Sequence, residues 1–172
     1  MPVEVDTIGW FSPDPRGVII PSEFHASRSL KKSARRFKTT VNQAFEDVLE
    51  ECAHPRRENG WINDNFKHAY KELHRLGWAH SVEVWDDQGL AGGVYGLAIG
   101  SFFAGESMFH RRTDASKVAL LSLVNQLRTR NDALLDVQWL TPHLESLGAQ
   151  EMRRLTYVNL LDKAVNAPPI LR

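Results

Sequence analysis

The pattern of apolar and polar positions begins with a turn-rich segment and two helices. Residues 1–22 are punctuated by Pro13, Pro15 and Pro21 and by Gly9 and Gly17, which predicts an extended entry and not a helix. Apolar residues then recur at helical spacing over 41–53, with Thr40 as the expected cap. The same spacing over 62–76 predicts a second helix, which Gly77 should end.

From residue 79 the period changes to two, which predicts strands. Strands are expected over 79–85, 90–99 and 101–109. The first two are joined by a turn in which Gly89 can adopt a positive φ. The pair Gly92-Gly93 inside the second strand indicates a bulge or a close backbone approach. The three strands therefore predict an antiparallel meander.

After the meander, helices and strands alternate. Residues 114–128 are apolar around much of a helical circumference, which predicts a well-buried helix. A short strand over 134–139, a short helix over 141–147 and a last strand over 151–158 follow. We therefore predict an α+β fold, in which an antiparallel meander is followed by helix, strand, helix and strand.

This order of elements resembles the acyltransferase fold of the N-acetyltransferase (GNAT) type. Those enzymes bind the pyrophosphate of coenzyme A with a Gly-rich turn before the central helix. Here residues 110–116 contain no glycine and instead offer His110, Arg111 and Arg112. We expect an extended N-terminal segment over 1–22 and a single acetyltransferase-like domain over 23–172.

Composition and charge narrow the class of protein. Lys+Arg 21 balances Asp+Glu 21, so a general binder of polyanions is not indicated, although a local basic surface remains compatible. The single cysteine, Cys52, excludes an internal disulfide framework and a multi-cysteine zinc site. The seven histidines lack metal-ligand spacing, so no metal is expected. Without a recognisable secretory signal or an apolar run of membrane-spanning length, we expect a cytoplasmic protein.

One acid lies inside a strand of large apolar residues, because FFAGESMF places Glu106 among them. A carboxylate is costly to bury there unless something pairs with it or uses it. Asp136 and Gln138 are two residues apart on another predicted strand and project from the same face. If the three lie together, they can hold an amine and accept its proton. A structural network in which Asp136 caps a neighbouring helix fits the same pattern.

Two other features also have two interpretations. Trp61, directly after Gly60, is either a platform for a nucleobase or an anchor in the core. The densest basic stretch is either a solvated face or a contact for a charged partner, and it contains Arg28, Lys31, Lys32, Arg35 and Arg36.

Several runs then carry a specific family resemblance. They include FSPDPRGVIIPSEFHASRSL, LGWAHSVEVWDDQGLAGGVYGLAIGSFFAGESMF, ASKVALLSLV and LLDVQWLTPHLESLGA, and together they extend from about Phe11 to Leu161. On these runs the chain resembles the leucyl/phenylalanyl-tRNA–protein transferases of bacteria. The combination of GESMF, ASK, DVQ and HLESLGA is highly specific.

The resemblance implies a reaction and its partners. Leu, Phe and sometimes Met would pass from the 3′ end of tRNA to the α-amino group of a protein that begins with Arg or Lys. This marks the acceptor for degradation through the N-end rule. The partners would be Leu-tRNA or Phe-tRNA and the acceptor protein, with no cofactor, no coenzyme A and no membrane. The family's fold is acetyltransferase-like, in agreement with the order of elements.

The resemblance also implies roles for individual residues. Gln138 would orient and activate the attacking amine, Asp136 would support it electrostatically, and Glu106 would bind the acceptor's amine or basic side chain. Trp61 would stack on the terminal adenosine. The pocket for the aminoacyl side chain would be apolar and selective by size, and it would comprise Phe103, Met108, Leu135 and Val94. The five basic residues named above would hold the acceptor stem by charge.

Members of this family usually carry a further N-terminal lobe with a Phe-Pro-Trp segment, whose Trp helps to enclose the adenosine. Residues 1–10 do not contain that segment, so we expect a short form of the family. Two alternatives remain at this point. A shortened relative would transfer the aminoacyl group to a small-molecule amine, and a non-catalytic module would only bind tRNA or a peptide.

Overall fold

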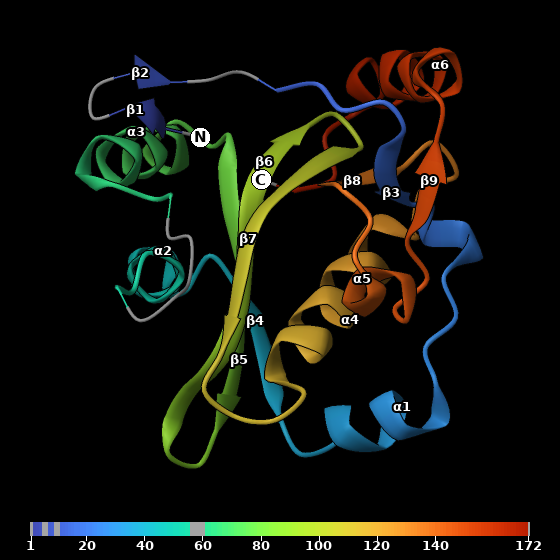
Figure 1. The fold of residues 1–172 in the computed structure, drawn as a ribbon. Helices are drawn as coiled ribbons and strands as arrows, with labels where there is room; N and C mark the ends of the chain where they lie inside the picture. The colour runs from blue at the N-terminus through green and yellow to red at the C-terminus, as the bar shows by residue number, and fades with distance from the viewer. Residues whose placement is uncertain (1, 5–6, 9–10, 56–60, 172) are drawn as a thin grey trace.

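A seven-stranded mixed sheet forms the centre of the molecule (Figure 1). The computed structural model describes residues 2–4, 7–8, 11–55 and 61–171. The strands lie in the order β4-β5-β6-β7-β8-β3-β9, and every neighbouring pair is antiparallel except β7–β8. They are β3 (Arg16–Ile19), β4 (Lys38–Val41), β5 (Ala79–Asp86), β6 (Gly89–Ile99), β7 (Phe102–His110), β8 (Leu134–Gln138) and β9 (Gln150–Met152). A separate antiparallel pair consists of β1 (Pro2–Glu4) and β2 (Thr7–Ile8).

Helices cover both faces of this sheet. The helices are α1 (Arg28–Ala34), α2 (Phe45–Cys52), α3 (Asp64–Arg75), α4 (Ala115–Leu127), α5 (Pro142–Glu145) and α6 (Arg154–Val165), with a short 3₁₀ turn η1 (Pro21–Glu23). Alternate residues of β6 and β7 pack in different clusters. Val94 and Phe103 join α4 in the largest cluster, whereas Tyr95 packs with α2 and α3, and Phe102 packs with α6. The central strands are therefore covered on both faces.

The predicted second half of the fold is confirmed up to α5. β5, β6 and β7 form the antiparallel meander, α4 follows, and β8 returns parallel to β7. This is the α+β, acetyltransferase-like order that the sequence predicts. Gly89 has φ 118° in the hairpin turn. A Cβ on Gly92 would lie 2.7 Å from Cβ of Ala115, so the expected close approach is made by α4.

The first predicted helix is wrong at its start. Residues 38–41 form β4, which pairs with β5 at the edge of the sheet, and α2 begins only at Phe45. Thr40 is therefore a strand residue and not a helix cap. β-branched Thr39, Thr40 and Val41 favour the pleated conformation, and this preference prevails over the apolar spacing that continues into the helix.

The predicted last strand is also wrong beyond its first residues. β9 ends at Met152, and α6 occupies residues 154–165. Tyr157, Leu160, Leu161 and Ala164 recur at helical spacing and pack on β3 and β8. The basic stretch was given no element from sequence, and part of it forms α1, which Ser27 caps by accepting from the Leu30 N–H.

The N-terminal residues contribute to the main sheet. β3 is extended, as expected for residues 1–22, and it lies between β8 and β9. The division of the chain at residue 22 stays a prediction. Among the described residues, no helix is long and apolar enough to cross a bilayer.

Candidate active site at the opening between two strands

The site lies where β7 and β8 separate. The two strands pair only from Phe102 to Ala104 and from Leu134 to Asp136, although both continue further. Just past this point β7 has an irregularity, because Tyr95 pairs with Ser107 and Gly96 pairs with Gly105. Glu106 is the extra residue of this bulge. Bulges redirect side chains and end pairing, and here the bulge places a carboxylate at the opening.

An apolar cavity of ≈ 120 Å³ lies beside the opening. A cavity of about 150 Å³ suffices to bind benzene in another protein, so this one has the scale of a single apolar side chain. Three of the four predicted pocket residues line it, namely Val94, Met108 and Leu135. Phe103 is fully buried in the adjoining core and does not line the cavity. Glu106 also lines it, and the remaining lining residues, which the sequence did not indicate, are Gly105, Ser107, Leu120, Leu123, Val137 and Leu144.

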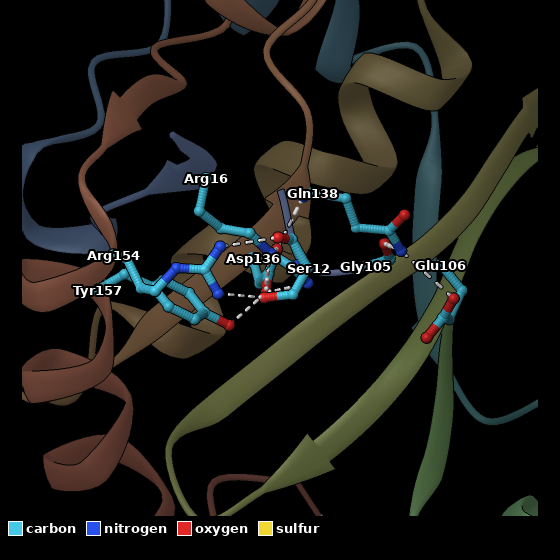
Figure 2. A network of polar contacts seen from close by, with 8 residues as sticks. All are labelled: Ser12, Arg16, Gly105, Glu106, Asp136, Gln138, Arg154 and Tyr157. Atoms are coloured by element: carbon cyan, nitrogen blue, oxygen red, sulfur yellow. Dashed lines mark hydrogen bonds and ion pairs between the residues drawn. The ribbon is translucent and has the colours of Figure 1, made fainter. Parts of the chain in front are cut away.

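Glu106 is half-buried beside this cavity. Gln138 Nε2 lies 3.4 Å from Glu106 Oε2 and 3.4 Å from the Gly105 carbonyl oxygen (Figure 2). The Tyr70 hydroxyl of α3 also interacts with Glu106. Burial raises the pKa of Glu106, and the charge of Asp136 adds to this, while the bonds from Tyr70 and Gln138 oppose it.

Asp136 is 1% exposed and fully engaged by donors. Arg16 Nε lies 3.1 and 3.0 Å from its two oxygens, and Arg16 Nη2 lies 2.9 Å from Oδ2. The Tyr157 hydroxyl donates to Oδ2 at 2.6 Å, and the main-chain N–H of Gln138 donates to Oδ1 at 2.7 Å. Asp136 therefore contacts the main chain of Gln138 and not its amide side chain.

The structure thus brings together the three residues predicted for chemistry. Figure 2 shows Asp136 among Arg16 and Tyr157, and the Gln138 side chain extending from β8 towards Glu106 on β7. Gln138 has φ 67°, in the left-handed region. Its backbone therefore departs from the regular strand that the sequence argument assumed. The roles of the three residues stay predictions.

A row of aromatic rings connects Trp61 to this site. Trp61 is half-buried, and its ring meets the edge of Phe66 at 5.2 Å between centroids. Phe66 is stacked 6.5 Å from Tyr70, which interacts with Glu106. Trp61 thus packs partly on the core and also stands at one end of a row that leads to the site, so both interpretations of this residue stay open. Tyr70 falls within the helix predicted over 62–76, and the helical spacing does not indicate its interaction with Glu106.

The five predicted tRNA-contacting cations lie apart from this centre. All five are exposed, on α1 or just after it, and Figure 1 shows α1 and α3 towards opposite ends of the molecule. Within the part of the chain that the structure describes, no ion pair joins any of them to a carboxylate. Their charge is therefore available to a partner.

The turn before α4 differs from a phosphate-binding turn. Arg111 pairs with Glu51 at 2.5 Å, and Arg112 pairs with Asp86 at 3.1 Å. The side-chain cations noted in the sequence are thus occupied by acids of the same chain. Across the described ranges, no group of three or more His, Cys, Asp or Glu side chains is arranged to hold a metal ion.

Comparisons with known proteins show the family to which the chain belongs. The family model described as "Leucyl/phenylalanyl-tRNA protein transferase" matches residues 18–162. The chain is 51% identical over 162 residues to the leucyl/phenylalanyl-tRNA–protein transferase of Shewanella sediminis, covering 92% of this chain and 69% of the relative. It is 48% identical over 167 residues to that of Shewanella baltica strain OS155, covering 95% and 70%.

Among solved structures, the chain is similar to L-PGS from Bacillus licheniformis, with a TM-score of 0.48 and 11% identity over 75% of this chain and 47% of that one. This similarity is too low to support a conclusion about fold or function. The family match covers most of the chain and includes the residues at the opening between β7 and β8. The chain belongs to the leucyl/phenylalanyl-tRNA–protein transferase family.

Proposed function

We propose that this protein transfers leucine, phenylalanine or methionine from aminoacyl-tRNA to the N-terminal α-amino group of proteins that begin with Arg or Lys. The acceptor would thereby enter N-end rule degradation in the cytoplasm. The names of the relatives support the donor and the reaction class. The observation that carries the proposal is the shared position of the apolar cavity, the Glu106 carboxyl and the Gln138 amide at one opening in the sheet.

The cavity gives the reaction its starting geometry. The aminoacyl side chain enters the space between Val94, Met108 and Leu135, which places its ester at the rim beside Gln138. The acceptor nitrogen attacks the ester carbonyl, a C–N bond forms, and the bond between the carbonyl carbon and the ribose 3′ oxygen breaks. The proton lost by the amine is balanced by the one gained by the 3′ oxygen. Because the ester is already activated, positioning supplies much of the acceleration.

The polar groups at the rim serve the amine. The Gln138 side-chain oxygen accepts a hydrogen bond from the attacking nitrogen, and its Nε2 already donates to β7 at Gly105 and Glu106. Glu106 accepts the proton that the amine must lose. Its raised pKa makes it a stronger base than an exposed glutamate when it is ionised. Tyr70 favours the charged form of the same carboxyl and so opposes part of the rise in its pKa.

The turn before α4 supports an acyl donor other than coenzyme A. This turn contains no glycine, and Arg111 and Arg112 are occupied by Glu51 and Asp86. A pyrophosphate would have to displace both acids. An aminoacyl-tRNA needs no pyrophosphate site at this turn, because its acyl group is already activated as an ester.

A label-transfer assay tests the proposed function. The protein is incubated with radiolabelled Leu-tRNA or Phe-tRNA and with a peptide that begins with Arg, alongside a peptide that begins with Ala. Label on the Arg peptide alone supports the proposal. Label that moves only to an added small amine indicates the shortened biosynthetic relative, and tRNA binding without transfer indicates a binding module. Either of these two results contradicts the proposal.

A further inference from the structure

We infer that Arg16 and Tyr157 are positioning residues, which fix Asp136 so that its carboxylate holds the Gln138 main chain in the conformation that aims the amide at Glu106. The inference rests on the proposed function for its consequence, because it concerns how Gln138 is presented to the amine. Neither Arg16 nor Tyr157 is adjacent in sequence to the three predicted residues. β3 and α6 bring them there.

The conformation of Gln138 needs an external support. Its φ of 67° is unfavourable for a residue that has a Cβ atom. The 2.7 Å bond from its N–H to Asp136 Oδ1 is the contact that compensates. The side chain then leaves β8 towards β7, where it reaches Gly105 and Glu106. In a regular strand, the Gln138 side chain would leave the backbone in a different direction.

Asp136 can give this support only if it stays ionised and does not rotate. A carboxylate that is 1% exposed is costly unless its charge is paired and its lone pairs are used. Arg16 supplies the charge and contacts both oxygens, and Tyr157 supplies a hydroxyl at 2.6 Å. The Arg16 guanidinium carbon also lies 5.5 Å from the centre of the Tyr157 ring, so the two donors restrain each other.

The same contacts show how Asp136 acts. Both of its oxygens are engaged by Arg16, Tyr157 and the Gln138 N–H, so no oxygen is left for the acceptor's amine. Asp136 therefore acts through Gln138. The chain after Gln138 is fixed as well, because Gly17 lies against the Trp139–Leu140 backbone. A Cβ at position 17 would lie 2.7 Å from the Trp139 carbonyl carbon.

Tyr157→Phe in the full-length protein is the direct test. It removes one donor to Asp136 and keeps the ring over Arg16. Because a hydrogen bond to a charged group is lost, kcat for transfer should fall by about tenfold. KM for aminoacyl-tRNA and for the acceptor peptide should stay within about twofold, because Tyr157 does not line the cavity. The amide proton resonance of Gln138 should move upfield as its bond to Asp136 loosens.

A double-mutant cycle and a matched control separate positioning from general destabilisation. In a Gln138→Ala background, Tyr157→Phe should change kcat by less than about twofold, because the amide that it positions is gone. Ser81→Ala is the control, since it removes a hydroxyl that donates at 2.5 Å to Glu83, another buried carboxylate, which lies on β5, two strands away from β7. This variant should lower the melting temperature without the loss of kcat. Arg16→Lys, which keeps the charge, should retain more activity than Arg16→Ala.

Three results would overturn the inference. One is an unchanged Gln138 amide resonance in Tyr157→Phe. Another is a double variant whose fold loss of kcat equals the product of the losses in Tyr157→Phe and Gln138→Ala alone. The third is an equal loss of kcat in Ser81→Ala. The amide resonance is measured without substrate, so it tests the positioning even if the wild-type protein fails the label-transfer assay and the proposed function is wrong.

Discussion

Replacing Leu144 by tryptophan tests whether the cavity takes the aminoacyl side chain. Leu144 is half-buried on α5 and lines the cavity together with Val94 and Met108. Because the cavity measures only ≈ 120 Å³, an indole that turns into it leaves no room for a second side chain. The position borders solvent, so the larger ring has space to settle without expanding the core.

The size of the effect follows from the surface that the substrate can no longer bury. Full burial of an apolar side chain such as Phe is worth about 1.5–3 kcal/mol. Its exclusion should therefore raise KM for Phe-tRNA by about 10- to 150-fold. kcat should change little, because Glu106, Asp136 and Gln138 are untouched and the lost interaction is equal in ground state and transition state.

The assay is steady-state transfer of labelled phenylalanine to a peptide that begins with Arg, with KM and kcat determined separately. Leu144→Met is the matched control, because it conserves volume and should cost less than about 1.5 kcal/mol of stability. Its KM should stay close to that of the wild type. If Leu144→Trp is folded, with an unchanged melting temperature, and still has the wild-type KM for Phe-tRNA, the side chain binds elsewhere.

The remaining predictions concern individual contacts at the site and on α1. A ¹³C NMR titration should show that the pKa of the Glu106 carboxyl lies above the ordinary glutamate value. As the solution is acidified, Glu106 should therefore lose its basic form at a higher pH than an exposed glutamate does. Tyr70→Phe should move this titration further upward, because it removes a bond that favours the charged form; a downward movement would contradict the assignment. Trp61→Ala should weaken aminoacyl-tRNA binding by about tenfold if the ring stacks on the adenosine, and an unchanged affinity, measured by filter binding, would leave it a core residue. Replacing both Lys31 and Lys32 by alanine should reduce the slope of log affinity against log salt by about 1 to 2, whereas an unchanged slope would mean that α1 does not contact the phosphates.

The sequence predicted the parts of the fold that depend on local periodicity. The alternation from residue 79 and the apolar helix over 114–128 reappear as β5–β7 and α4, because both patterns are long and bury their apolar positions. β4 was missed because four residues are too few for a pattern, and its strand conformation depends on pairing with β5. The helical spacing from Tyr157 to Ala164 was present, but only its first residues were considered, as a strand.

For the candidate site, the sequence predicted the residues but not their geometry. Glu106, Asp136 and Gln138 could be proposed because polar residues interrupt apolar strands, and the family resemblance supported them. Their geometry depends on contacts between distant segments. Arg16 and Asp136 are 120 residues apart in sequence. The bond from the Gln138 N–H to the Asp136 side chain is local, but the alternating strand pattern does not indicate the left-handed φ that accompanies it. The bulge that exposes Glu106 likewise depends on the register between β6 and β7.

The central claim is that Gln138 acts on the attacking amine at the opening between β7 and β8. The most direct measurement compares Gln138→Ala with the wild type in single-turnover transfer from Phe-tRNA, with the Kd for Phe-tRNA measured on the same preparations. The account predicts that the transfer rate falls by about 100-fold or more, as for the loss of a preorganised polar group, while Kd stays within about twofold. A transfer rate that stays at the wild-type value, or one that falls only in proportion to a weakened Kd, would contradict it.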